Sequence, residues 1–228
     1  MRLEHLAGAA AIALFATVGT ASASLVIQAQ VAPPLFTPMN IGTGPADSFI
    51  GSGALGPIAG TQISSITFTG GSATGAPNPP SGVYTGNQDS IAKSPFIPPD
   101  ATSEYLVAQA NNGQVTVTFS TGQSELDILW GTIDSAEGYN LVTTDGAQTV
   151  SGADILALVG GASGDTNAYV RITSFDAPIL SFTASDSTTS SAFEFTLGTI
   201  AAPEPASIAI VGAALAGLGL MRRRRKSA

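Results

Sequence analysis

The chain of 228 residues contains no cysteine, and its single histidine is His5. Without cysteine the chain can form no disulfide, no thiolate nucleophile and no thiolate metal site. Beyond His5 it also cannot build a Ser-His-Asp triad or an imidazole zinc site. These absences exclude much catalytic chemistry, and among enzymes the sequence favours one that depends on carboxylates. A chain of this length can still be stabilised by burial of a hydrophobic core.

Basic residues are scarce except at one place. Five of the eight are consecutive, from Arg222 to Lys226. Between residues 24 and 202 only Lys93 and Arg171 are basic, against fourteen acidic residues, so this body has a net charge of −12. Phosphates of nucleic acid repel such a body, and the sequence therefore predicts no nucleic-acid binding.

The first 23 residues have the pattern of a secretory signal peptide. Arg2 supplies the positive start, Leu6 to Val18 form an apolar segment, and Ala21-Ser22-Ala23 matches a cleavage box. Thirteen apolar residues are too few to span a bilayer. We expect the Sec translocon and signal peptidase to act on residues 1–23, the alternative being a buried helix.

The end of the chain combines an apolar segment with the basic cluster. Residues 206–221 carry no charge, and as a helix they would be about 24 Å long, which is short against a bilayer core of about 30 Å. Snorkelling of the arginines or local thinning of the bilayer would close this gap. The arginines would stay in the cytoplasm and leave the acidic body outside. The sequence predicts a transmembrane helix here; the alternative is a soluble helix with a basic tail.

Residues 24–202 are predicted to form one all-β domain, an antiparallel β-sandwich or jelly roll. Short segments alternate in polarity, as in Val115–Phe119 and Leu126–Trp130, and turn residues recur every eight to twelve positions. Residues 139–151 resemble a hairpin with an Asp145-Gly146 turn. Residues 151–160 break the pattern and predict one short helix, capped by Ser151 and ended by Gly160.

One group of residues suggests a glycan-binding site. Trp130, the only tryptophan, would offer a stacking platform with Tyr139, and Asp134 and Asn140 would bind hydroxyl groups. The alternative, which we favour, places Trp130 in the core because it shares a strand face with Leu126 and Ile128.

Acidic residues are densest in the middle of the chain, at Glu125, Asp127, Asp134, Glu137 and Asp145. Paired carboxylates can catalyse glycoside hydrolysis, and oxygen ligands can bind calcium, but no calcium-loop spacing is present. We favour solvated loop charges, and expect no metal or other cofactor.

Glu194 lies between two phenylalanines on a predicted strand, so its side chain points to the opposite face. We expect it either to be an exposed charge or to pair with Arg171 across the sheet.

The tail resembles a known sorting signal. Pro203, Glu204 and Pro205, the apolar segment and the cluster Arg222, Arg223, Arg224 and Arg225 are similar to the PEP-CTERM signal of Gram-negative bacteria. The resemblance implies that residues 203–228 are recognised by an exosortase, a membrane-embedded protease that cuts near Pro-Glu-Pro. It implies an inner-membrane-anchored precursor and a mature form at the cell surface or outside the cell.

The body resembles one class of exosortase-dependent surface proteins, which have a strand ending in Trp-Gly-Ser, an Asp-Ser turn, a Tyr-Asn pair and a late Ala-Phe-Glu-Phe strand. The corresponding residues here are Trp130, Gly131, Thr132, Asp134, Ser135, Tyr139, Asn140, Ala192, Phe193, Glu194 and Phe195. Thr132 stands where serine is usual, and residues 136–138 look like an insertion. The class has no settled biochemical role, so the resemblance implies a β-rich extracellular body.

Together these features predict an exported surface, extracellular-matrix or biofilm protein that is not an enzyme. Its role would be structural or adhesive, with exopolysaccharide as a partner. The alternative is a secreted carboxylate-dependent polysaccharide hydrolase or lyase.

Overall fold

The computed structural model describes residues 24–31, 36–41, 53–71, 80–87, 92–96, 102–164, 166–188 and 191–200. The predicted signal peptide, transmembrane helix and sorting segment lie outside the described residues. Within those ranges, no helix is long and apolar enough to cross a membrane.

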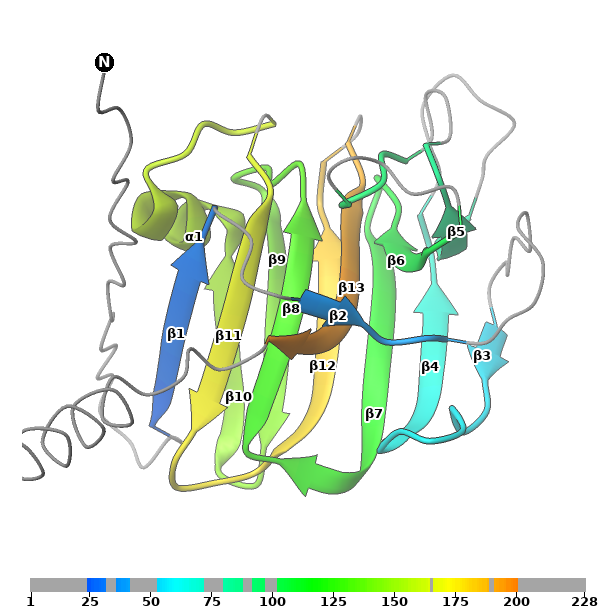
Figure 1. Cartoon of the computed structure of the whole chain (residues 1–228), viewed down its shortest axis with the longest axis vertical. Coiled ribbons are helices and arrows are strands. Elements are labelled where there is room, and N and C mark those ends of the chain that lie inside the picture. The colour runs from blue at the N-terminus through cyan, green and yellow to red at the C-terminus, as the bar shows by residue number, and fades with distance from the viewer. Residues whose placement is uncertain are drawn as a thin grey trace, which may run out of the picture.

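Two antiparallel β-sheets face each other, as Figure 1 shows, and a single short helix lies beside them. Sheet A contains, in spatial order, β1 (Leu25–Gln30), β11 (Ala168–Ser174), β8 (Glu125–Gly131), β13 (Phe193–Ile200), β6 (Glu104–Ala108) and β5 (Gly82–Thr85), and β2 (Phe36–Pro38) pairs with β13. Sheet B contains β10 (Gly146–Ser151), β9 (Glu137–Thr143), β12 (Ile179–Asp186), β7 (Gly113–Gln123), β4 (Ile63–Thr69) and β3 (Gly53–Leu55). The predicted antiparallel β architecture with one short helix is confirmed.

The main core lies between the two sheets and follows from the alternation of side chains along each strand. In β7, Val115 and Val117 point inward and are fully buried, as predicted. In β8, Ile128 and Trp130 do the same. Phe182 of β12, in sheet B, packs against Phe195 of β13, in sheet A, with ring centroids 5.2 Å apart, so both sheets contribute to one continuous core.

A bulge in β4 explains a pattern that strict alternation does not. Ile63 and Ile66 are three residues apart, yet both are buried. The pairing of β4 with β7 shifts register between Ile63 and Ser65, and such a shift brings both side chains to the core face.

The Asn112-Gly113 turn, a sequence typical of hairpins, joins two different sheets here. Asn111 and Asn112 adopt φ values of 60° and 65°, a left-handed conformation that asparagine tolerates. The turn leads from β6 in sheet A to β7 in sheet B. The predicted hairpin is formed by β9 and β10, with Thr144 and Asp145 as its two-residue loop. The turn thus begins one residue earlier than the Asp-Gly signal indicates.

Helix α1 (Gly152–Val159) begins and ends at the predicted residues. The Ser151 hydroxyl oxygen accepts a hydrogen bond from Asp154 N at 3.2 Å, and the Asp154 carboxylate accepts one from Ser151 N at 2.9 Å. This capping box satisfies two backbone donors at the start of the helix. Gly160 ends it with φ 65°. Gly152 is required because a Cβ atom there would lie 1.9 Å from the carbonyl oxygen of Asp134.

The outer faces of the two sheets differ. On sheet A, residues 92–96 cover part of the outer face and form a second small hydrophobic cluster with Tyr84, Tyr105 and Val107. On sheet B, the outward positions are mostly serine and threonine and are exposed or half-buried. Side chains on the outer face of sheet A can therefore be as deeply buried as core residues.

Candidate functional site

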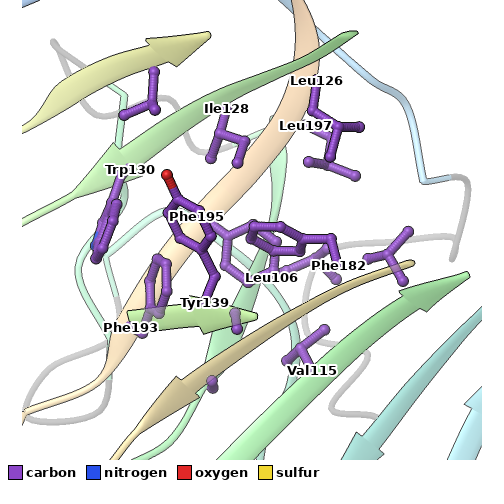
Figure 2. Close-up of a cluster of buried hydrophobic side chains, with 14 of the residues drawn as sticks. Leu106, Val115, Leu126, Ile128, Trp130, Tyr139, Phe182, Phe193, Phe195 and Leu197 are labelled. Carbon is purple, nitrogen blue, oxygen red and sulfur yellow. The ribbon is translucent and has the colours of Figure 1, made fainter. Parts of the chain in front are cut away.

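Trp130 and Tyr139 lie inside the core. Both side chains are 0% exposed, and Trp130 stacks on Phe193 with ring centroids 4.3 Å apart. Tyr139 packs against the same indole at 5.4 Å, and Figure 2 shows these rings gathered with Phe195 and Phe182. The core alternative for Trp130 is therefore the one that the structure shows. Neither ring offers a free face to a sugar.

Asp134 and Asn140 do not join these rings in one surface. Asp134, half-buried after the end of β8, accepts a hydrogen bond from the Ser163 hydroxyl at 2.8 Å. Asn140 is exposed on the outer face of sheet B, where its side-chain oxygen accepts a hydrogen bond from the Thr149 hydroxyl. Glycan binding stays a prediction, but the four side chains named for it do not form one site.

Glu137, at the start of β9, is buried against the edge of the indole ring. Its side chain is 1% exposed. Its Oε2 atom accepts hydrogen bonds from Trp130 Nε1 at 2.8 Å and from Asp134 N at 3.0 Å. Burial raises the pKa of the Glu137 carboxyl to about 10, although these two hydrogen bonds act to lower it. The prediction of a solvated loop charge is wrong for Glu137, which is a neutral core carboxyl near pH 7.

Glu194 of β13 is buried on the outer face of sheet A, beneath residues 92–96. Its carboxylate oxygens accept hydrogen bonds from Lys93 N at 2.9 Å and from the Thr132 hydroxyl at 2.8 Å. Burial raises the pKa of this carboxyl to about 8, against the lowering effect of those two donors. Both sequence-based expectations are wrong, because Glu194 is neither exposed nor paired with Arg171.

Thr132, in the turn after β8, is the residue whose hydroxyl reaches Glu194. It has a φ of 38°, in the left-handed region that non-glycine residues rarely adopt. Its backbone N donates a hydrogen bond to the Asn167 side chain at 2.7 Å, and Asn167 donates to Pro95 O at 2.9 Å. These bonds fix the turn after β8 to the segment that covers Glu194.

Asp186 completes the group of buried carboxyls at this end of the molecule. It is directly opposite Glu137 in the pairing of β12 with β9, and it is fully buried. One of its oxygens accepts a hydrogen bond from Thr188 N at 2.6 Å. Burial raises its pKa, and the neighbouring Asp134 carboxylate raises it further. No sequence pattern singles out Asp186, because an aspartate at a strand end usually faces water.

At this end of the molecule Glu137, Asp186 and Glu194 are buried away from solvent, and the negative charges of Asp186 and Glu194 both act to raise the pKa of Glu137. Within the described part of the chain, Glu137 Oε1, Asp186 Oδ2 and the Tyr139 hydroxyl are buried without a hydrogen-bond partner. The same part contains no group of three or more acidic or histidine residues placed to hold a metal ion. A carboxyl with a raised pKa can act as a general acid, but it must be able to reach a substrate.

Asp127 and Arg171 form an ion pair on the outer face of sheet A. Arg171 Nε donates to one oxygen of Asp127 at 2.8 Å, and its NH2 group donates to the other at 3.0 Å. Glu125 lies 3.4 Å from the same guanidinium group. The predicted solvated charge is therefore wrong for Asp127, which is buried and paired, whereas Asp145 is exposed in the β9–β10 turn.

A cavity of about 400 Å³ opens at the other end of β8. Its lining includes Gln62, Phe119, Gln123, Glu125 and Leu197. The volume lies in the range of small-molecule pockets. Trp130, Asp134, Tyr139 and Asn140 are absent from its lining, so it is separate from the glycan site that the sequence suggested.

Comparison with known proteins identifies the tail. A family model described as the PEP-CTERM protein-sorting motif matches residues 201–226. The chain carries a PEP-CTERM sorting motif. The match includes Pro203, Glu204, Pro205 and Arg222–Arg225, all outside the described residues, and it confirms the resemblance seen in the sequence. No curated protein and no solved structure matches the chain.

The PEP-CTERM motif implies an exported protein that is anchored in a membrane as a precursor and processed by an exosortase. The basic residues at the end of the chain are thus part of a sorting signal that another enzyme recognises.

Proposed function

We propose that the mature body works at the cell surface or in the extracellular matrix of a Gram-negative bacterium. There it is a structural or adhesive component that contacts exopolysaccharide. The observation that carries the proposal is the PEP-CTERM motif at residues 201–226, because it marks the acidic β-rich body in front of it for export. Residues 24–202 form the working part, and exosortase is the processing partner.

We further propose that the body is not an enzyme. Of the carboxylates considered for catalysis, Glu137 is buried with its oxygen bound to Trp130 and Asp134, and Asp127 is held by Arg171. These contacts support the view that Glu137 and Asp127 stabilise the fold and do not act in catalysis. A glycosidase needs two carboxyl groups on either side of a substrate.

The sorting part is tested in the native host with Glu204→Ala and with a deletion of residues 222–225. Both changes remove parts of the motif, so we expect the precursor to accumulate in the membrane fraction and the mature form to disappear from the surface and the medium. Fractionation followed by mass spectrometry of the exported protein measures both results and locates both cleavage sites. Asp145→Ala, in an exposed turn of the body, serves as the control and should be processed normally. Normal release of both tail variants would refute processing by an exosortase.

The non-enzymatic part is tested with the exported protein purified from the host. We expect no release of reducing sugar or unsaturated product from a panel of neutral and anionic polysaccharides. Turnover that disappears in Asp127→Asn, Asp134→Asn or Glu137→Gln, while the variant remains folded by circular dichroism, would instead establish the hydrolase or lyase.

A further inference from the structure

The outer face of sheet B is a continuous plane of uncharged side chains, which we call the hydroxyl face. Five strands contribute to it, and its members alternate with core residues along each strand. They are Ser65, Thr67 and Thr69 of β4, Gln114, Thr116 and Thr118 of β7, Ser181, Thr183 and Ser185 of β12, Asn140 and Val142 of β9, and Ala147 and Thr149 of β10. All of them are exposed or half-buried.

Strand register aligns these side chains into rows. The central row crosses the sheet through directly paired residues, in the order Thr67, Thr116, Thr183, Asn140 and Thr149. Neighbouring strands are about 4.8 Å apart, and outward residues on one strand recur about every 6.7 Å. The hydroxyl oxygens of Thr116 and Thr183 are 3.0 Å apart, within hydrogen-bonding distance. The face therefore presents a regular lattice of hydroxyl and amide groups.

The hydroxyl face carries no charged side chain, although the body as a whole is strongly acidic. None of its members is Lys, Arg, Asp or Glu, although residues 24–202 carry fourteen acidic residues. An anionic polymer would be repelled by the acidic body and would find no cation on this face. A neutral, hydroxyl-rich partner is compatible with both features.

Apolar groups lie among the hydroxyls. Val142 is 37% exposed on this face, and Leu180, which immediately precedes Ser181, is 38% exposed. Val142 pairs directly with Ser181, whereas the Leu180 side chain lies on the β7 side of β12, near Gly122. Each threonine adds a methyl group beside its hydroxyl. Sugar rings also combine apolar C–H faces with hydroxyl edges, and binding sites for such ligands combine the same two kinds of group.

We propose that the hydroxyl face binds neutral extracellular polysaccharide along its surface. The hydroxyl and amide groups of its rows exchange hydrogen bonds with sugar hydroxyls, and Val142, Leu180 and the threonine methyls contact C–H groups. A second copy of the chain fits less well, because the face lacks the apolar centre that interfaces between identical subunits usually have. This inference rests on the proposed function, in that an exported body is what meets such a polymer.

The test is a depletion assay with the exported protein purified from its host. Its probes are cellulose, insoluble β-1,3-glucan and the neutral polysaccharide of the host's own matrix, with alginate as the anionic comparison. Thr183→Glu places a charge at the centre of the face, where contact with a neutral polymer would desolvate it. We expect the binding constant for the neutral probe to fall about tenfold or more. Thr183→Ser, which keeps the hydroxyl, should retain binding.

Thr102→Glu is the matched control, because it makes the same change at an exposed position just before β6, in the sheet opposite the face. It should bind within about twofold of the unmodified protein. If Thr183→Glu lowers the unfolding temperature, Thr149→Glu on the edge strand β10 replaces it.

The inference is overturned if the unmodified protein binds none of the neutral probes, or if Thr183→Glu and Thr149→Glu bind as the unmodified protein does. A dimer that Thr183→Glu dissociates would also overturn it, in favour of self-association. The proposed function fails separately, if the unmodified protein is found unprocessed inside the cell. The two failures are distinguishable, because fractionation measures where the protein is located and the depletion assay measures whether the hydroxyl face binds polysaccharide.

Discussion

At the residue scale, the buried carboxyls of Glu137 and Glu194 make the stability of the fold depend on pH. Their pKa values are raised from 4.5 to about 10 and about 8. Between 4.5 and these values the folded state binds more protons than the unfolded state. The contribution of both groups to stability is therefore fully present below about pH 4.5 and decreases as the pH rises through 8 toward 10.

We expect the free energy of unfolding to be lower at pH 9 than at pH 5, because over most of this range the folded state keeps protons on both carboxyls that the unfolded state has released. Glu137→Gln and Glu194→Gln cannot ionise and should each weaken this dependence. Denaturant unfolding at several pH values measures it. Asp145→Asn, in an exposed turn, should leave the slope unchanged. A stability that is constant from pH 5 to 9 would show that these carboxyls are not buried as described.

The burial of Glu194 also shows where residue-scale prediction stops. Alternation along β13 correctly places it on the face opposite Phe193 and Phe195. Whether that face meets water depends on Lys93 and its neighbours, about a hundred positions earlier in the chain. No local pattern contains this information. Trp130, in contrast, was correctly placed in the core because Ile128 lies two residues before it on the same face.

At the element scale, α1 was predictable because its capping signals are local. Ser151→Ala removes one side of the capping box and should lower the free energy of unfolding by about 1 kcal/mol. Ser151→Asn, which can still cap, should restore most of the loss. Ser124→Ala, an exposed serine outside α1, is the control and should have little effect. Equal unfolding midpoints for Ser151→Ala and the unmodified protein would contradict a stabilising cap.

The pairing of strands was harder to predict from the sequence than the positions of the strands along the chain. The segments now seen as β7 and β8 were predicted from alternation, whereas the bulge in β4 depends on its register with β7. The order of strands in sheet A joins β1 to β11 and β8 to β13, partners that are far apart in sequence. Alternation determines which face a residue occupies, but it says nothing about which strand lies alongside.

At the scale of the whole molecule, the sorting motif could be distinguished from the folded domain by sequence alone. Residues 203–226 were sufficient to recognise it, because the motif is a linear signal. The hydroxyl face was not recognised, although each threonine on it was visible in the sequence, since the face exists only when five strands are in register.

The position of β13 has a consequence for the timing of export. This strand lies inside sheet A, bonded to β8, β6 and β2, and it ends at Ile200, three positions before Pro203. A chain that crosses a membrane from its N-terminus delivers β13 last, so the core cannot close until nearly the whole body has crossed. Folding is then completed while the tail still holds the chain in the membrane. The exosortase would therefore act on a body that has already folded, because its last strand ends only a few residues before the motif.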